Sequence, residues 1–383
     1  MAGRIAFLLG NLGGGGAERT MLLLAGRFAA AGHGVDLVLG RADGALASAV
    51  PDGVRVVDLG AARTRTLVPK LALWLRRERP GVLLSTTDAA NLAAVAARAL
   101  SGVPLRLVLR QSEAVAPSLR GATRWRDRWR LPLLRWLYPR ADAIVAISHG
   151  VAEDLVATVG LPRDRVTVIH NPVDVARAAA LAAEPPDHPW FAAGEPPVVL
   201  AVGRLVPQKD FATLLDAFAR LRARRPARLV VLGEGPLRAA LLAHAESLGV
   251  AADVAFPGFA ANPFPAMARG GVFALSSRWE GFGVVLVEAL ACGCPVVSTD
   301  CPSGPAEILE DGRWGALVPV GDAARLAEAL EAALAAALDD PGDADARRRR
   351  AADFAPERAL PLYSAALGIE WVPRNSSNNA AQR

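Results

Sequence analysis

The sequence predicts two α/β domains, each built on a doubly wound parallel sheet. The chain of 383 residues is too long for one ordinary domain and suits two of roughly 180 residues each. Short runs rich in β-branched and aliphatic residues alternate with helical patterns along both halves. The alternation is interrupted at residues 182–197, a proline-rich stretch that we interpret as an interdomain linker.

The composition is that of a globular protein. Hydrophobic residues make up 52% of the chain and charged residues 21%, which allows a sizeable core. No apolar run approaches the roughly 18 residues that span a bilayer, and the apolar stretch before the first glycines is too short for a signal peptide. We therefore expect a cytoplasmic protein. Cys292, Cys294 and Cys301 have no histidine nearby, so we expect buried apolar side chains rather than a zinc site, which needs about four ligands.

The first half reads as one domain over residues 1–185. Its first strand is followed by a glycine loop and by a helix from Ala17 to Ala31, which Gly32 closes. The predicted strands of this half cover residues 4–9, 35–39, 54–59, 81–85, 105–110, 142–147 and 166–170. Helical patterns lie between most of them, as is typical of a parallel sheet covered on both faces.

The second half repeats the alternation over residues 186–355. Its predicted strands cover residues 197–203, 227–233, 253–258, 271–277, 294–299 and 315–320. A helix over 356–370 follows, and residues 371–383 form a polar tail. Two doubly wound domains that face each other place the carboxyl ends of both sheets at a shared cleft, where ligands of such sheets bind.

The loop after the first strand, GNLGGGGAERT, places the amides of Gly15 and Gly16 at the start of a helix, which suits an anion. The dinucleotide pattern GxGxxG is not met because Arg19 stands where the third glycine would be, and the P-loop pattern GxxxxGK[ST] is absent. A flexible turn is the simplest explanation of the loop. Four consecutive glycines exceed the needs of a turn, however, and favour close approach to a ligand or to the opposite domain.

Two cations follow the first strand of the second half, in the segment VGRLVPQKDF. Arg204 lies just past the strand, and Lys209 lies at the start of the next helix. The chain has 43 Lys and Arg residues, of which only Lys70 and Lys209 are lysines. A lysine at this position therefore departs from the chain's strong preference for arginine. Both cations could be solvated surface charges. At the carboxyl end of a sheet they also supply the compensating charge that a bound diphosphate requires.

The segment EGFGVVLVE begins with Glu280, just before a predicted helix, and ends with Glu288, about one turn inside it. The backbone amides of Gly283, Val284 and Val285 would form the helix N-terminus, which again suits an anion. Glu280 could merely complement the helix dipole, and Glu288 could face solvent. The apolar neighbours of Glu288 instead predict a helix buried nearly all round, in which a carboxylate needs donors. A nucleoside-diphosphate sugar offers them as ribose and sugar hydroxyls.

The segment EGFGVVLVEALACGCPVVSTD resembles the E-x7-E region of retaining glycosyltransferases of the GT4 family, which have the GT-B fold. Other blocks resemble that family in the expected order: GGGGAERTMLLLAGRFAAAGHGVDLV, ADAIVAISHGVAEDL, VIHNPVD, VGRLVPQKDF, VLGEGPLRAALL and CPSGPAEILEDGRWGALVPVGD. The resemblance covers residues 4–370. It implies two Rossmann-like domains facing a cleft, with the helix over 356–370 crossing back onto the first domain.

The resemblance also implies roles for individual residues. The amides from Gly283 to Val285 would hold the diphosphate together with the two cations, Glu288 would hold the ribose, and Glu280 would hold the transferred sugar. The implied catalytic residues are Arg204, Lys209 and Glu280. The implied donor-binding residues are Gly15, Gly16, Arg204, Lys209, Glu280, Phe282, Gly283, Val284, Val285 and Glu288. We expect no cofactor and no metal requirement.

The chain departs from the family pattern on the acceptor side. Many relatives carry a histidine in the loop after the strand over 105–110, near the reacting sugar. The loop reads QSEAVAPS in this chain, so a histidine-dependent role cannot be carried over. Ser112 or Glu113 would substitute in hydrogen bonding.

A basic segment with tryptophans, RGATRWRDRWRLPLLRWLYPR, spans residues 120–140. Such a helix suits an anionic membrane surface. The candidates for that contact are Arg124, Trp125, Arg128, Trp129 and Trp136. No recognised nucleic-acid motif accompanies the segment, so we expect no nucleic-acid partner. An ordinary helix on the flank of the domain is the alternative.

Together these features predict a metal-independent, retaining glycosyltransferase. It would move a hexosyl or N-acetylhexosaminyl group from a nucleoside-diphosphate sugar, with UDP as the expected nucleotide, to a lipid-linked or surface-polysaccharide acceptor. The segment DCPSGPAEIL resembles members that act on such acceptors. The alternatives are another GT-B activity such as sugar-nucleotide epimerisation, and a non-catalytic nucleotide-sugar-binding or membrane-scaffold protein. A peripheral location at the inner face of the plasma membrane is a further expectation.

Overall fold

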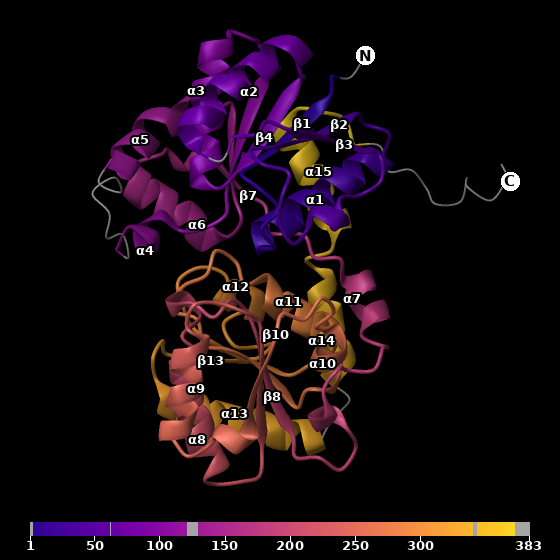
Figure 1. Ribbon diagram of the computed structural model, residues 1–383, viewed down its shortest axis with the longest axis vertical. Coiled ribbons are helices and arrows are strands. Elements are labelled where there is room, and N and C mark those ends of the chain that lie inside the picture. The colour runs from indigo at the N-terminus through magenta and orange to yellow at the C-terminus, as the bar shows by residue number, and fades with distance from the viewer. Residues whose placement is uncertain (1–2, 62, 121–128, 340–342, 372–383) are drawn as a thin grey trace, which may run out of the picture. The chain divides into compact units, whose positions relative to one another are not determined.

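The chain divides into two compact units, seen in the computed structural model of Figure 1. The structure describes residues 3–61, 63–120, 129–339 and 343–371. The first unit ends at Pro172 and resumes at Pro356, whereas the second unit runs from Val173 to Ala355. The chain therefore passes between the units twice. This division lies earlier than the expected boundary after residue 185, because the helix that follows Pro172 packs on helices of the second unit.

The first unit is built on a sheet in which the described residues form seven parallel strands. The strand order is β3-β2-β1-β4-β5-β6-β7. The strands are β1 (Ile5–Leu9), β2 (Val35–Leu39), β3 (Val54–Asp58), β4 (Val82–Thr86), β5 (Arg106–Gln111), β6 (Ala143–Ala146) and β7 (Val166–Val168). β1, β2 and β4 are buried along their whole length, as expected of central strands whose two faces are both covered. β3 lies at an edge and is partly exposed.

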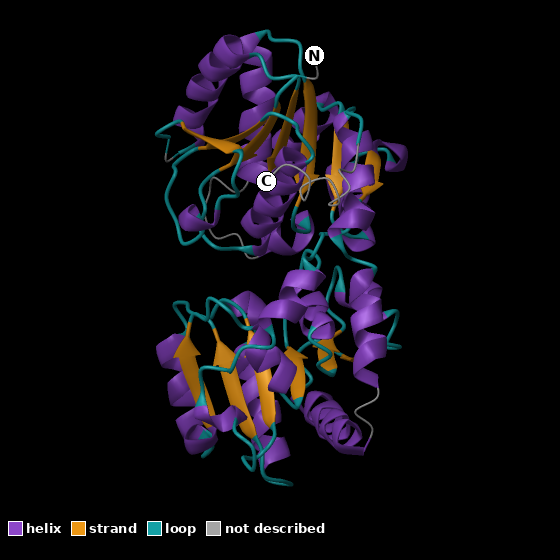
Figure 2. Ribbon diagram, turned by 90° about the vertical axis from the view of Figure 1, so that its right-hand side faces the viewer, coloured by secondary structure: helices purple, strands orange, loops and turns teal. Residues whose placement is uncertain are grey.

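Helices cover both faces of this sheet, as Figure 2 shows. The helices of the first unit are α1 (Gly16–Ala30), α2 (Thr64–Glu78), α3 (Asp88–Ser101), α4 (Val115–Arg120), α5 (Arg130–Leu137), α6 (His149–Asp154) and α15 (Pro356–Leu367). α15 comes from the far end of the chain, yet it supplies Ala359, Leu360, Tyr363 and Leu367 to the core around β1 and α1 (Figure 1). The C-terminal helix therefore belongs to the first unit.

The second unit is built on a parallel sheet with the order β10-β9-β8-β11-β12-β13. The strands are β8 (Val198–Val202), β9 (Arg228–Leu232), β10 (Val254–Gly258), β11 (Val272–Leu275), β12 (Val296–Thr299) and β13 (Ala316–Val318). The helices are α7 (Val175–Leu181), α8 (Phe211–Arg222), α9 (Arg238–Ser247), α10 (Phe264–Arg269), α11 (Val284–Ala291), α12 (Pro305–Leu309), α13 (Ala323–Asp339) and α14 (Ala344–Ala352). The core on one face packs α8 and α13 against the strands.

The two sheets confirm the predicted fold class. Every strand predicted from the sequence is present, and its ends are shifted by at most two residues. In both sheets the strand order reverses beside the first strand, with β1 between β2 and β4, and with β8 between β9 and β11. This is the switch point at which doubly wound sheets bind ligands. Within the described part of the chain, no helix combines the length and apolar character needed to cross a membrane.

Candidate functional site

Three loops of the second unit share the carboxyl edge of its sheet. β8, β11 and β12 are consecutive in the strand order, so the loops that follow them lie side by side. The loop after β8 carries Arg204 and Lys209, and the loop after β11 carries Glu280. The third loop spans residues 300–304. The sequence therefore folds so that separate motifs meet at one edge.

Lys209 and Glu280 form an ion pair across two of these loops, although they are 71 residues apart in the chain. The lysine Nζ lies 2.5 Å from Oε1 of the carboxylate, and the two side chains are only 14% and 9% exposed. The Ser277 hydroxyl donates to the same oxygen over 2.6 Å. Oε1 of Glu280 thus accepts from a cation and from a hydroxyl, and the lysine charge is neutralised by an adjacent carboxylate.

Backbone and side-chain bonds hold the two loops together around this pair. The Ser276 hydroxyl donates to the carbonyl of Lys209 over 2.7 Å. The Gln208 side chain donates to the carbonyl of Trp279 over 2.9 Å, and the Arg278 amide donates to the carbonyl of Gln208 over 2.8 Å. The relative position of the lysine and the glutamate is therefore set by the fold and does not depend on the ion pair alone.

A second ion pair, between Arg278 and Asp210, lies next to the first. Arg278 Nε is 3.0 Å from a carboxylate oxygen of Asp210, which is buried. The hydrogen bond to Asp210 raises the pKa of the Arg278 guanidinium. Asp210 also accepts from the hydroxyl of Thr213 at the start of α8. Sequence reasoning missed this pair, because Asp210 makes no capping hydrogen bond to α8 and Arg278 lies 68 residues away in the chain.

No side chain among the described residues caps the amides at the start of α11. Gly283 precedes the helix with φ of 94°, a backbone conformation that residues with a side chain rarely adopt. Val284, Val285 and Glu288 are the partly exposed residues of α11, and their spacing places them on one face. The expectation of a helix buried nearly all round is therefore wrong for this face. The half-buried Glu288 shares it with the residues whose amides begin the helix.

The loop at residues 300–304 closes against the segment that carries Glu280. The amide of Glu280 donates to the carbonyl of Pro302 over 3.1 Å. Gly304 has φ of 99°, and a Cβ there would lie 1.8 Å from the carbonyl oxygen of Phe282. Only glycine allows the two loops to approach so closely. Phe282 is itself buried, and its ring contacts that of Phe354 with the centroids 5.4 Å apart.

Arg204 differs from Lys209 because it is exposed. Its guanidinium has no hydrogen-bond or ion-pair partner among the residues that the structure describes, so it is available to an anion at the sheet edge. Gly15 is the N-cap of α1 in the first unit and Gly16 is its first residue, and no side chain in the described part of the chain caps this helix. They lie in a different unit from Lys209 and Glu280.

The acceptor-side candidates Ser112 and Glu113 follow β5 in the first unit. Ser112 is half-buried and Glu113 is exposed, whereas Gln111 just before them is buried. The Gln111 amide donates to Asp88 over 2.8 Å and to the carbonyl of Glu113 over 2.7 Å, and its oxygen accepts from Tyr138. Gln111 is therefore held within a polar network, whereas the next two residues are accessible.

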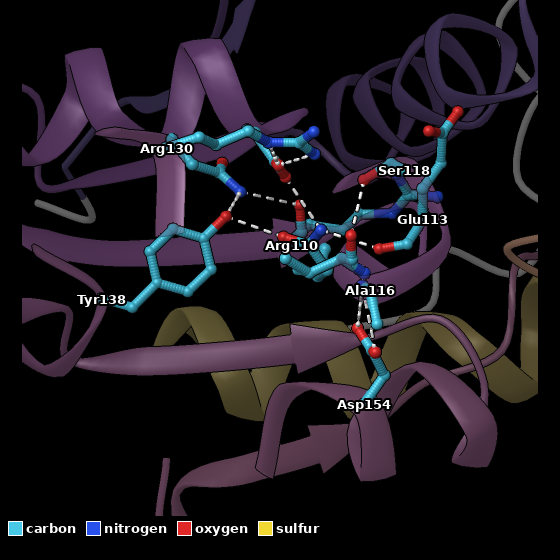
Figure 3. A network of polar contacts seen from close by, with 11 residues as sticks. Arg110, Glu113, Ala116, Ser118, Arg130, Tyr138 and Asp154 are labelled. Atoms are coloured by element: carbon cyan, nitrogen blue, oxygen red, sulfur yellow. Dashed lines mark hydrogen bonds and ion pairs between the residues drawn. The ribbon is translucent and has the colours of Figure 1, made fainter. Parts of the chain in front are cut away.

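Asp154 holds the other end of this loop, as Figure 3 shows. Its carboxylate accepts hydrogen bonds from the amides of Val115 and Ala116 at the start of α4, the second over 3.1 Å. The Thr158 hydroxyl donates to the same carboxylate from a turn of π-helix, Leu155–Val159, that continues α6. No sequence signal identifies this contact, because Asp154 lies 39 residues from Val115 in the chain.

One face of α5 carries large apolar side chains into solvent. Trp129, Leu133 and Trp136 are 62%, 42% and 60% exposed, and their spacing places them on one side of the helix. The guanidinium of Arg140 stacks on the Trp136 ring, 4.1 Å from its centroid. The other membrane-surface candidates, Arg124, Trp125 and Arg128, lie outside the residues that the structure describes.

Together these features define a protein with two doubly wound α/β units, the second of which offers cations and helix amides to an anion. Comparison with known proteins identifies the class. Residues 14–177 match the family model "Glycosyltransferase Family 4", and residues 196–336 match the model "Glycosyl transferases group 1". The lipopolysaccharide core biosynthesis glycosyltransferase LpsE of Rhizobium meliloti is 32% identical over 268 residues, which cover 70% of this chain and 69% of LpsE. This chain belongs to glycosyltransferase family 4.

Two further proteins are similar to this chain, one over about half of its length and the other over nearly all of it. The N-acetylgalactosamine-N,N'-diacetylbacillosaminyl-diphospho-undecaprenol 4-alpha-N-acetylgalactosaminyltransferase of Campylobacter jejuni is 37% identical over 202 residues. The match covers 53% of this chain and 53% of that enzyme, so the chain spans about half of its length. The structure of HepE of Anabaena in complex with UDP and glucose has a TM-score of 0.77 at 22% identity, covering 96% of this chain and 99% of HepE. This likeness shows that the fold is shared.

Proposed function

We propose that this protein transfers a hexosyl or N-acetylhexosaminyl group from a nucleoside-diphosphate sugar to a lipid-linked or surface-polysaccharide acceptor. The observation that carries the proposal is the Lys209–Glu280 pair beside the uncapped start of α11, at the switch point of the second sheet. LpsE and the Campylobacter relative support the acceptor class by their names, and HepE supports UDP as the nucleotide.

In this proposal each group of the donor has a matching group in the second unit. Arg204, Lys209 and the amides that begin α11 compensate the charge of the diphosphate once water is displaced. Glu288 accepts hydrogen bonds from the ribose hydroxyls, and the free oxygen of Glu280 accepts from a hydroxyl of the transferred sugar. The partial exposure of Glu288 on the same face as Val284 supports this assignment.

The chemical step is the departure of the nucleoside diphosphate. Arg204, Lys209 and the helix amides stabilise the charge that develops on the leaving phosphate, which is an interaction that strengthens in the transition state. As the bond between the sugar carbon and the phosphate oxygen breaks, the acceptor hydroxyl attacks that carbon from the face that the phosphate leaves and passes its proton to the departing diphosphate, so the configuration is retained. In this scheme the positive charge comes from protein groups, and the reaction requires neither a metal nor a cofactor.

We further propose that the exposed face of α5 rests on an anionic membrane surface. Tryptophans are favoured at the level of lipid headgroups, and arginines are attracted to anionic lipids. The arrangement of Trp129, Leu133 and Trp136 on one face, with Arg140 beside it, supports this proposal. Sedimentation with vesicles of anionic and of zwitterionic lipids tests it. Wild-type protein should bind the anionic vesicles at low salt, and Trp136→Ser should weaken binding; equal binding by both proteins would contradict the proposal.

The test of the enzymatic proposal begins with the nucleotide. A ligand that binds only the native state raises its stability, so a panel of nucleoside diphosphates should reveal the donor base as a rise in Tm. The matching sugar nucleotides are then incubated with lipid-linked acceptors, and transfer is followed by mass spectrometry. Consumption of the sugar nucleotide without any acceptor would favour epimerisation, and binding without consumption would favour a non-catalytic protein. Absence of any nucleotide response would contradict the proposal.

A further inference from the structure

The pairing of Lys209 has a consequence for how a donor binds. We propose that Glu280 is the resting counter-ion of Lys209: it holds the lysine while the site is empty and yields it to the diphosphate when the donor arrives. Ser277 then retains the carboxylate. The inference rests on the proposed function, because that function supplies the diphosphate.

The burial of the pair explains why a counter-ion is needed. An ammonium group that is largely shielded from water is unfavourable unless a negative charge compensates it. Lys209 is only 14% exposed, and its Nζ lies 2.5 Å from Glu280 Oε1. The pair is therefore neutral as a whole when an anion approaches it. An exposed cation such as Arg204 needs no such compensation.

The lysine is able to change partner. Its charge sits on a flexible stem of four carbons, unlike the rigid fork of an arginine. The stem packs against Gly203, where an added Cβ would come within 3.3 Å of Cε, so a side chain at this position would crowd the stem. A diphosphate carries more negative charge than one carboxylate and competes for the ammonium group.

Ser277 still donates a hydrogen bond to the Glu280 carboxylate after Lys209 has moved to the diphosphate. Its hydroxyl lies 2.6 Å from Oε1 of Glu280 and remains as a donor. Ser277 is completely buried, and its carbonyl accepts from the Thr299 hydroxyl of the neighbouring strand over 2.6 Å, so its position is fixed. The amide of Glu280 is also fixed by the carbonyl of Pro302. Ser277 is thus a positioning residue that makes release of the lysine less unfavourable.

The resting pair can be tested without any ligand, because the chain contains only two lysines. Lys70 is exposed, with its Nζ 2.8 Å from the carbonyl of Gly60, and serves as the internal reference. A pulse of acetic anhydride followed by peptide mass spectrometry gives both acylation rates. We expect Lys209 to react at least tenfold more slowly than Lys70 in the wild type. Glu280→Gln should accelerate acylation of Lys209 at least fivefold and leave Lys70 unchanged. Equal rates of Lys209 in the two proteins would overturn the proposal.

The exchange of partners is tested with UDP as the probe, by calorimetric titration. Glu280→Gln should bind UDP about tenfold more tightly than the wild type, because Lys209 no longer has to leave a carboxylate. In a Lys209→Met background the same substitution should give no gain. Asp300→Asn, which removes one negative charge from the same sheet edge, is the control and should stay within twofold. A wild type that binds UDP while Glu280→Gln binds it equally or more weakly would overturn the inference and leave the proposed function standing.

The role of Ser277 has its own matched control. Ser277→Ala should weaken UDP binding by less than tenfold, because the hydrogen bond is present in both states and only its strengthening after release of the lysine is lost. It should have no effect in the Glu280→Gln background, since it acts through the carboxylate. Ser298 is equally buried, and its hydroxyl donates to a backbone carbonyl, so Ser298→Ala controls for the loss of a buried hydroxyl. A similar loss in both alanine variants would overturn the positioning role. Failure of the wild type to bind any nucleoside diphosphate would overturn the proposed function and the exchange step. In that case the acylation rates would still show whether Glu280 pairs with Lys209 in the absence of a ligand.

Discussion

The fully buried guanidinium of Arg110 yields the sharpest prediction for stability. Its Nε donates to the Tyr363 hydroxyl over 3.1 Å, its Nη1 donates to Thr86 over 2.7 Å, and its Nη2 donates to the side-chain oxygen of Asn171. These acceptors are neutral, so the charge depends on each hydrogen bond. Tyr363→Phe removes one acceptor without removing ring atoms, so it leaves no large cavity. Loss of a hydrogen bond to a charged group typically costs about 1.5–3 kcal/mol. We expect the free energy of unfolding of the first unit to fall by about 2 kcal/mol.

Native-state hydrogen exchange is the appropriate assay, because a protein of two units need not unfold as one cooperative transition. The slowest amides of β1 and β4 report unfolding of the first unit, and those of β8 report the second unit, which should not change. In an Arg110→Met background Tyr363→Phe should have little effect, because the charged donor is gone. A decrease below about 0.5 kcal/mol in the wild-type background would refute the reasoning.

Three further predictions concern the site, the loop after β5 and the buried thiols. Lys209→Ala should lower turnover by on the order of 100-fold in a transfer assay, the usual effect of losing one group that stabilises developing charge; near-normal turnover would contradict its assignment. Asp154→Ala should accelerate amide exchange in residues 113–118 about tenfold, since removal of a helix cap costs about 1 kcal/mol or more; unchanged exchange would mean that the cap does not order this loop. Burial raises the pKa values of the thiols of Cys292, Cys294 and Cys301 from 9.0 to about 12. Between these pH values the unfolded chain loses protons that the folded chain keeps, so the free energy of unfolding of the second unit should fall as pH rises from 9 to 12, by up to about 1.4 kcal/mol per thiol and pH unit. Hydrogen exchange of the slowest amides of β8, under reducing conditions, measures this fall for the second unit, and the fall should be smaller when all three cysteines are replaced by alanine.

The architecture was predictable because its signals are local. Aliphatic strand runs separated by helical patterns specify a parallel sheet wherever they occur, and the observed strands agree with the predicted ones. The division of the chain was harder to predict. The proline-rich stretch at 182–197 looks like a linker, but α7 precedes it and already packs on the second unit, so the crossing falls at Pro172. Composition predicts which segments are irregular, but it does not predict against which core a helix packs.

The site was predictable to the extent that its groups lie in motifs. Lys209 and Glu280 were identified separately, each from its place after a strand, but their ion pair depends on the adjacency of β8 and β11. The supporting residues were missed for the same reason. The hydroxyl of Ser277 and the carboxylate of Asp154 act on partners that the fold brings close. A serine after a strand is common, and only the tertiary structure distinguishes the one that bonds a carboxylate.

The return of α15 to the first unit sets an order of events during synthesis. The second unit is one continuous segment, so its core can close as soon as Ala355 has emerged from the ribosome. Most of the first unit is synthesised earlier, yet its core lacks Leu360 and Tyr363 until α15 has been made. The first unit, although most of it is synthesised first, therefore completes its core after the second unit. A chain terminated just before Pro356 would fold its second unit and leave the first with an uncovered apolar surface, open to chaperones and proteases.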